Sequence, residues 1–161
     1  MSINKNHLLK KIIESLEMVL QNALSATEIA HESATNKNNI AENKYDTLGL
    51  EAAYLAHGQS QRVQQCQLDL IAYKDFLPHS FEKSEIITVG ALIFLLDDGV
   101  KKNIFLGPAS GGLKFEFDQK EILIITTSAP LGKALLGSRV DDEIKLNIGG
   151  NKKYYEVLSI A

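Results

Sequence analysis

Apolar residues recur at alternating spacings of three and four along the first part of the chain. The series is Leu9, Ile12, Leu16, Val19, Ala23, Ala26 and Ala30. This spacing places apolar side chains on one face of an α-helix and is typical of a coiled-coil seam. Neither Pro nor Gly interrupts residues 1–48. The seam changes from large to small residues along the chain, which lets a second helix approach closely at its far end.

A second, weaker seam follows. Its members are Ala52, Leu55, Gln59, Val63, Cys66, Leu70, Tyr73 and Leu77. Gln59 is polar, and Gly49 and Gly58 lower the helix propensity. The pattern predicts two antiparallel helices of about 25 to 30 residues, about 40 Å long. The polar link TNKNNIAENKYDT, residues 35–47, would form the tip of this hairpin.

The periodicity changes in the second half of the chain. Pro78 ends the second helix, and residues 78–85 resemble a linker. From Ile86 on, short β-branched and aromatic runs alternate with turn residues. A brief helix is expected in LGKALLG, with Ser128 and Pro130 near its start and Gly137 near its end. DEIKLNI and KKYYEVLSI, separated by a Gly-Gly turn, predict a final hairpin.

These patterns predict a two-domain α+β protein. Residues 1–77 would form the helical coiled-coil hairpin, and residues 78–85 would form the linker. Residues 86–161 would form a small domain in which an antiparallel sheet carries one short helix.

Composition and charge narrow the class of protein. The net charge of −3 gives no global electrostatic case for nucleic-acid binding. The single cysteine, Cys66, cannot form an internal disulfide, which fits a reducing compartment. No apolar run reaches the about 18 residues of a membrane span, and the N-terminal MSINKNHLLKK lacks the apolar core of a signal peptide. We expect a cytoplasmic monomer without a membrane partner.

Catalytic signals are sparse. The four histidines have no zinc-site spacing with one another or with Cys66. The Gly-rich stretch 107–112 matches neither a Walker A loop nor a dinucleotide fingerprint, and a turn is expected there. The acidic cluster 141–143 taken alone indicates a solvated turn. The sequence therefore predicts no enzyme site of its own and no cofactor of its own.

The stretch TTSAPLGKALLGSRVDDEIKLNIGG followed by KKYYEVLSI resembles the C-terminal signature of the bacterial Gre transcript-cleavage factors, GreA and GreB. The matching features are Ala129-Pro130, the short helix ending at Gly137, the acidic step 141–143, the Gly149-Gly150 turn and the strand 155–160. The strand opening Thr88-Val89-Gly90-Ala91 also fits. The plan of hairpin, linker and sheet extends the resemblance over the whole chain.

The resemblance implies an FKBP-like C-terminal domain that docks on the rim of the secondary channel of bacterial RNA polymerase. The coiled coil then passes down the channel to the polymerase active site. Acidic tip residues help to hold a Mg²⁺ ion shared with the polymerase, which cuts the 3′ end of backtracked transcript RNA. Mg²⁺ prefers hard oxygen ligands, which carboxylates supply.

The tip matches the family motif Gly-Asp-Leu-x-Glu-Asn-x-Glu-Tyr in part. Glu42-Asn43 and Ile40 agree with it, but Asn39 stands where the family has Asp. Asp46 could stand in as a second carboxylate. The resemblance thus implies Glu42, Asp46 and Asn39 as the residues that assist the polymerase, with Glu42 and Asp46 as metal ligands only within the complex. Ordinary helix capping by solvated carboxylates is the alternative.

The loop before the short helix contacts the polymerase rim in the family. Here that loop is Thr127, Ser128, Ala129 and Pro130. A simple helix N-cap is the alternative for this loop, and the two roles can coexist.

Three functions remain open at this point. The factor could stimulate cleavage of backtracked RNA, or occupy the channel without stimulating cleavage. It could instead be a coiled-coil adaptor whose partner is not polymerase. A prolyl isomerase would fit an FKBP-like fold, but fold alone does not give function, and the chain has no Trp to line an aromatic substrate pocket.

Overall fold

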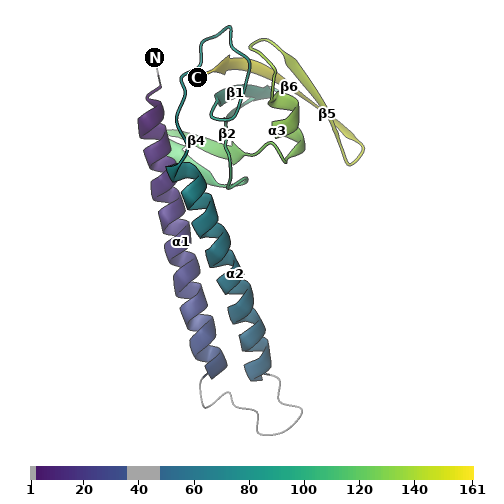
Figure 1. The fold of residues 1–161 in the computed structure, drawn as a ribbon. Coiled ribbons are helices and arrows are strands. Elements are labelled where there is room, and N and C mark those ends of the chain that lie inside the picture. Colours follow the sequence, from purple (N-terminus) through teal and green to yellow (C-terminus); the bar gives the residue numbers. More distant parts are fainter. Residues whose placement is uncertain (1–2, 36–47) are drawn as a thin grey trace. The chain divides into compact units, whose positions relative to one another are not determined.

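Two long helices make up the first half of the protein, and a six-stranded sheet makes up most of the second (Figure 1). The computed structural model describes residues 3–35 and 48–161. The helices are α1 (Lys5–Thr35), α2 (Leu48–Lys74) and the short α3 (Pro130–Leu135). The strands are β1 (Leu92–Asp97), β2 (Val100–Leu106), β3 (Lys114–Phe117), β4 (Lys120–Ile125), β5 (Glu143–Ile148) and β6 (Asn151–Ile160).

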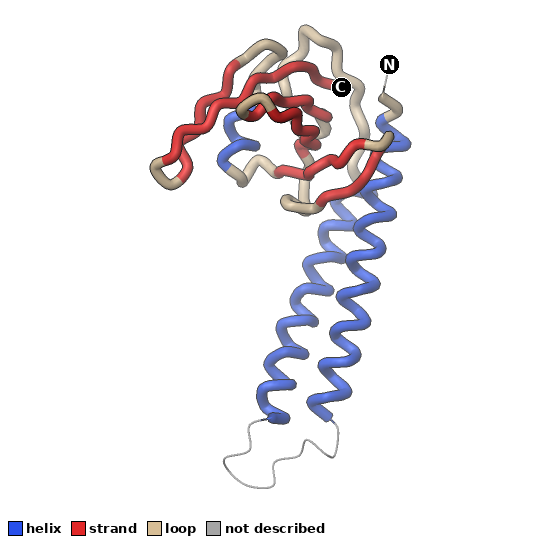
Figure 2. The backbone as a smooth tube through the Cα atoms, turned by 180° about the vertical axis from the view of Figure 1, so that it is seen from behind, coloured by secondary structure: helices blue, strands red, loops and turns tan. Residues whose placement is uncertain are grey.

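The predicted hairpin is confirmed, because α1 and α2 lie side by side in opposite directions in both backbone views (Figures 1 and 2). Ile12, Leu16, Ala23 and Ala30 of the first predicted seam are buried. Leu8 is 1% exposed, whereas its neighbour Leu9 is only half-buried.

The second seam was wrong at two positions. Leu55 is 57% exposed and Leu77 is 85% exposed. Ala56 is buried in place of Leu55, which restores a strict alternation of four and three between Ala52 and Tyr73. Leu77 lies beyond the end of α2 at Lys74, so the helical spacing no longer applies to it.

The sheet has the strand order β3-β4-β2-β1-β6-β5. All neighbouring strands are antiparallel except β2 and β4, which are parallel. The prediction of an antiparallel sheet therefore holds for every pair but one. The exception follows from the connection: β3 runs antiparallel to β4, so β4 returns to the direction of β2 and pairs beside it.

The short helix α3 lies beside the strands (Figures 1 and 2), and the core of the sheet unit includes its residue Leu135. Leu135 of α3 is fully buried among inward-facing residues of β1, β2 and β6, including Ile93, Ile104 and Val157. These residues alternate with side chains on the other face of the sheet, as the period of two requires. α3 is therefore held in one position against the sheet, and this packing fixes the position of the loop that precedes it.

The protein divides into two compact units. The sheet unit comprises Met1–Ile12 and Ala72–Ala161, and the hairpin unit comprises Ile13–Ile71. This division differs from the expected ranges 1–77 and 86–161, because the start of α1 and the end of α2 group with the sheet.

Tyr73 is one of the residues that tie α2 into the sheet unit. Its side chain is 0% exposed, and its hydroxyl donates a hydrogen bond of 2.9 Å to the Ala109 carbonyl. Its ring centroid lies 6.5 Å from that of Phe105. A Cβ atom on Gly107 would lie 2.2 Å from the Tyr73 hydroxyl. The Gly-rich stretch 107–112 therefore forms the expected turn, and its first glycine makes room for Tyr73.

Candidate functional site

The sequence predicts functional residues in two separate places, the segment between α1 and α2 and the loop before α3. The tip residues Asn39, Glu42 and Asp46 lie outside the described residues. Their roles stay predictions from the sequence. The loop Thr127 to Pro130 is described in full and can be built from its contacts.

The loop leaves β4 and turns into α3 within a few residues. The hydroxyl oxygens of Thr126 and Ser128 lie 2.7 Å apart in a hydrogen bond. The Ala129 N–H donates to the Thr126 carbonyl at 3.1 Å, which closes the turn. Ser128 and Pro130 are exposed, while Thr127 and Ala129 are half-buried. The loop therefore presents a small, internally bonded surface to solvent.

Ser128 lies near the start of the short helix, as predicted, but it is not the N-cap residue. The N-cap residue is Ala129, whose backbone is extended at φ −78° and ψ 148° and which makes no side-chain capping bond. Pro130 is the first helical residue, where its missing N–H costs nothing. The Ser128 hydroxyl pairs with Thr126 instead. The loop therefore contains the N-cap residue, Ala129, but no side chain of the loop caps the helix, and the Ser128 hydroxyl stabilises the turn instead.

The close packing of α3 against the end of β4 depends on Gly132, a residue for which the sequence predicted no role. A Cβ atom at this position would lie 2.0 Å from the Thr126 carbonyl oxygen and 3.1 Å from the Ile125 side chain. Only glycine lets α3 approach the end of β4 this closely. A glycine inside a short helical pattern is the signal that could have revealed it.

The acidic cluster after α3 has a structural role. The Asp142 carboxylate accepts a 2.7 Å hydrogen bond from the Arg139 N–H. The backbone of Asp141 and Asp142 also pairs with Val157, at 2.8 and 3.0 Å. The expectation of an exposed acidic turn agrees with this geometry, because all three residues 141–143 are exposed.

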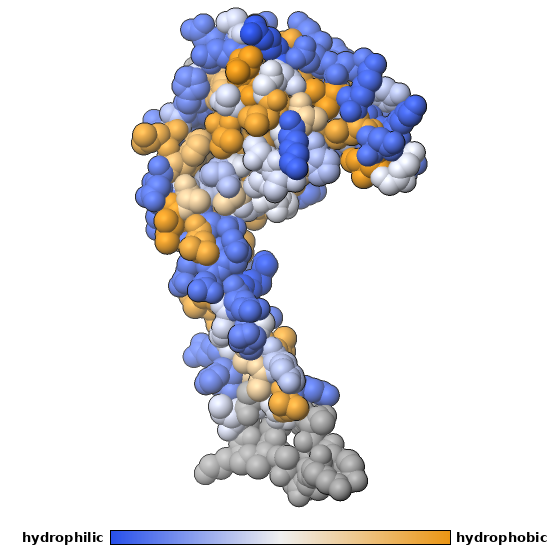
Figure 3. All heavy atoms as spheres, turned by 45° about the vertical axis from the view of Figure 1, so that its right-hand side comes forward, coloured by the Kyte–Doolittle hydropathy of each residue, from blue (hydrophilic) through white to orange (hydrophobic). Residues whose placement is uncertain are grey.

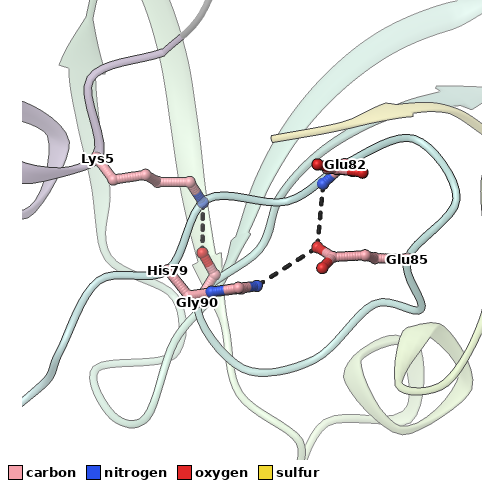
Figure 4. A network of polar contacts seen from close by, with 5 residues as sticks. All are labelled: Lys5, His79, Glu82, Glu85 and Gly90. Atoms are coloured by element: carbon pink, nitrogen blue, oxygen red, sulfur yellow. Dashed lines mark hydrogen bonds and ion pairs between the residues drawn. The ribbon is translucent and has the colours of Figure 1, made fainter.

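Lys5 is a buried charged residue in the sheet unit, and nothing in the sequence indicated it. It is 7% exposed, and its ammonium group donates a 2.5 Å hydrogen bond to the Gly90 carbonyl (Figure 4). The same nitrogen lies 5.1 Å from the centroid of the Phe81 ring and 5.7 Å from that of Phe105. Burial lowers the pKa of Lys5 from 10.5 to about 8. The lysine thus links the start of α1 to the entry of β1.

A pH dependence of stability follows from Lys5. In the unfolded chain its pKa is 10.5, so between pH 8 and 10.5 the unfolded state binds more protons than the folded state. The free energy of unfolding should therefore rise with pH in this window. We expect wild type to gain about 2 kcal/mol relative to Lys5→Met between about pH 7.5 and about pH 10. Urea unfolding of both proteins at both pH values measures this gain, and parallel pH curves would contradict it.

The loop that precedes β1 contains a second polar contact (Figure 4). The Glu85 carboxylate accepts a 3.0 Å hydrogen bond from the Glu82 N–H and lies 3.4 Å from the His79 ring nitrogen. His79 also meets the Phe81 ring edge-on at 4.8 Å. These contacts order the segment between α2 and β1, and they give His79 a structural role.

The described residues hold no metal centre of their own. Within residues 3–35 and 48–161, no group of three or more His, Cys, Asp or Glu side chains could hold a metal ion. His7 packs edge-on against Phe117 at 5.3 Å, and His31 and His57 are exposed on the helices. Cys66 is buried in the seam, in agreement with a packing role. No helix in the described parts of the chain is long and apolar enough to cross a membrane.

Comparison with known proteins finds a similarity that includes the loop and the strands around it. Residues 112–161 match the family described as "Transcription elongation factor, GreA/GreB, C-term". This segment contains β3 to β6, α3 and the loop 127–130.

Three curated relatives extend the comparison. The GreA of Novosphingobium aromaticivorans is 40% identical over 76 residues, which is 46% of this chain and 44% of that protein. The GreA of Syntrophus aciditrophicus is 28% identical over 94% of this chain and 88% of that protein. The transcription inhibitor protein Gfh1 of Thermus aquaticus is 26% identical over 94% of this chain and 90% of that protein.

Residues 112–161 thus resemble the C-terminal segment of the GreA/GreB transcription elongation factors, and the GreA of Syntrophus aciditrophicus and the Gfh1 of Thermus aquaticus each align with 94% of the chain.

Proposed function

We propose that this protein is a Gre-type factor that binds bacterial RNA polymerase, inserts its helical hairpin into the secondary channel and modulates elongation. The observation that carries the proposal is the family match over residues 112–161, the segment that holds the α3 loop and its supporting strands. The long α1–α2 hairpin supplies a narrow element able to enter a channel. The protein would act in the cytoplasm, where the polymerase is.

The loop Thr127 to Pro130 would contact the rim of the polymerase channel. Ser128 and Pro130 are exposed, and the Thr126–Ser128 hydrogen bond holds the turn in one shape. A loop fixed by its own bonds loses little conformational freedom on binding. The close approach of Gly132 to Thr126 fixes the loop relative to α3.

The hairpin tip would act in the polymerase active site. Glu42 and Asp46 would offer carboxylates to a Mg²⁺ ion shared with the polymerase, and Asn39 would offer an amide oxygen. A second Mg²⁺ there would stabilise the charge that develops when the 3′ end of backtracked RNA is cut.

A second candidate function is channel binding without stimulation of cleavage. Asn39 replaces the acidic residue of the family motif, and Lys44 adds a positive charge nearby, so the tip is a poorer Mg²⁺ site. One of the relatives, aligned over 94% of this chain, is a transcription inhibitor protein. Both functions require binding to polymerase, and only the first requires a tip that holds a metal.

Co-elution with bacterial RNA polymerase and competition with a GreA protein test the shared requirement. We expect wild type to bind, and Ser128→Arg to bind about tenfold more weakly, because a bulky cation at the centre of the loop disrupts the contact. Asn147→Arg, on an exposed position of β5, is the matched control and should bind like wild type. If neither wild type nor the control variant binds polymerase, the result favours a coiled-coil adaptor with another partner.

Stalled elongation complexes with the same proteins separate the two functions. If the tip assists cleavage, wild type releases short 3′ fragments, Glu42→Ala loses this activity and Asn39→Asp increases it. If wild type and Asn39→Asp both bind polymerase but release no fragments, the factor occupies the channel without stimulating cleavage.

A further inference from the structure

The hairpin of β5 and β6 extends past the rest of the sheet (Figures 1 and 2). The two strands pair with each other as far as Ile148 and Asn151, whereas β1 pairs with β6 only from Tyr155 onward. Among the strands that the structure describes, residues 145–154 therefore pair only with each other. This projecting ribbon of two strands is here called the arm. Because a ribbon of two strands adds little stability by itself, the packing of the sheet does not explain the arm.

The arm is positively charged, although the whole protein is not. It contains Lys145, Lys152 and Lys153 and neither Asp nor Glu, in a chain whose net charge is −3. Lys145 and Lys152 are exposed, and Lys153 is half-buried. Hydrophilic atoms cover much of the sheet unit (Figure 3), so it is the sign of the charge, rather than polarity, that distinguishes the arm. The arm therefore attracts an anionic partner.

Acidic residues lie in a pocket at the base of the arm. They are Asp98, Asp141, Glu143 and Glu156. Lys152 and Glu156 are four residues apart along β6, or about 13 Å, which exceeds the screening length of about 10 Å at about 0.1 M salt. Lys145 lies closer, with 3.4 Å between its nitrogen and the Glu143 carboxylate, and such an exposed pair contributes little. The end of the arm therefore keeps its positive potential, and an anionic partner contacts this end rather than the base.

We infer that the arm binds duplex DNA by lying in its major groove. Lys145, Lys152 and Tyr154 share one face of the arm, because Lys145 pairs directly with Tyr154 and Lys152 lies two residues from Tyr154 on the same strand. The Lys145 nitrogen lies 5.9 Å from the centroid of the Tyr154 ring, and Tyr154 is 43% exposed. Lys and Tyr side chains are among those that donate hydrogen bonds to DNA phosphates. Three such donors therefore lie together on one side of a projecting ribbon.

The shape of the arm also fits this groove. Neighbouring strands lie about 4.8 Å apart, and the major groove of B-DNA is about 12 Å wide and admits a ribbon of two strands. The turn at the end of the arm is Gly149-Gly150, with φ of 58° and 84°, which makes a tight two-residue turn without side chains. The arm is thus narrowest where it would enter the groove. The major groove of an RNA duplex is deep and narrow, so DNA is the duplex that the arm fits.

Three lysines predict weak binding that does not depend on the base sequence. If each lysine neutralises one phosphate, the affinity falls about 40-fold between about 0.1 M and about 0.4 M salt. We expect a dissociation constant of about 1 mM at the lower salt concentration, since three contacts are fewer than most non-specific DNA-binding proteins make. This contact goes beyond the proposed function and does not rest on it, because the arm would meet DNA and the loop 127–130 would meet polymerase.

An NMR titration of the isotope-labelled full chain with a DNA duplex of about 16 base pairs, without polymerase, tests this binding. We expect the amide signals of residues 144–155 to shift at about 0.1 M salt, and these shifts to disappear at about 0.4 M salt. Lys152→Glu combined with Lys153→Glu should weaken binding by at least about tenfold. Lys83→Glu combined with Lys133→Glu changes the net charge by the same amount at exposed positions outside the arm and should bind like wild type.

The spectrum of each variant also shows whether the arm has kept its fold. If the charge reversal disturbs the arm, Lys152→Gln combined with Lys153→Gln removes the charge alone and should still weaken binding. The arm does not bind DNA if its wild-type signals do not shift, or if the charge reversals inside and outside the arm weaken binding equally. Equal shifts with a matching RNA duplex or with polyglutamate would overturn DNA as the partner. Because the titration needs no polymerase, its result is independent of the proposed function.

Discussion

Replacing Gly132 by Ala is expected to lower the free energy of unfolding of the sheet unit by about 3 kcal/mol. The new Cβ atom would lie 2.0 Å from the carbonyl oxygen and 2.8 Å from the carbonyl carbon of Thr126. These are backbone atoms, so no side-chain rotation relieves the clash, and either α3 or the end of β4 has to move. Ala has the higher helix propensity, by about 1 kcal/mol, and the steric cost outweighs it. Urea unfolding followed by circular dichroism measures the difference.

The same substitution in α2 should have the opposite sign. An added Cβ atom at Gly58 meets no heavy atom within 4 Å, so Gly58→Ala should stabilise its helix by about 1 kcal/mol. Comparing the two variants separates helix propensity from packing. If Gly132→Ala and Gly58→Ala stabilise the protein equally, α3 does not pack as closely against Thr126 as the structure shows. If the proposed function holds, Gly132→Ala should weaken polymerase binding as well as stability, because the close packing of α3 on Thr126 also fixes the loop.

Truncating Tyr73 to Ala should cost about 4 kcal/mol of unfolding free energy. The residue is 0% exposed, so its removal leaves a large cavity between the end of α2 and the sheet. It also removes the hydroxyl that bonds to the Ala109 carbonyl. Tyr73→Phe keeps the ring and loses only that hydrogen bond, for which about 1 kcal/mol is expected. Thermal and urea unfolding of both variants measure the two contributions.

Tyr54 provides the control for Tyr73 on the same helix. It is 70% exposed, so Tyr54→Ala in dilute protein should change stability by no more than about 0.5 kcal/mol. A large effect at Tyr54 and a small one at Tyr73 would show that the inward and outward faces of α2 are assigned the wrong way round.

The helical hairpin was predictable because its signal is local. Residues three or four apart on a helix lie on the same face, so the spacing from Ile12 to Ala30 is enough to indicate the seam. The same rule failed at Leu55, because a step of three and a step of four both keep a residue near the seam. In the structure Ala56 is buried and Leu55 is exposed, and the spacing alone could not distinguish these two neighbours.

The candidate site was predictable in position but not in its internal contacts. Ala129-Pro130 and Gly137 marked a short helix, and α3 lies there. The pairing of the Ser128 hydroxyl with Thr126 could not be foreseen, since a serine before a helix more often caps it. The close approach of Gly132 to Thr126 could not be predicted either, because it depends on how α3 packs against the sheet.

The sequence by itself determined the helical hairpin, the change to short strands after Pro78, the turns and the short helix, because each depends on residues a few positions apart. Only the tertiary structure decided the parallel pairing of β2 with β4, the burial of Lys5 and the anchoring of Tyr73. Lys5 and Gly90 are 85 residues apart in the chain, and Tyr73 and Ala109 are 36 apart. Contacts of this kind form only when the whole sheet unit has folded, so no local pattern of residues can encode them.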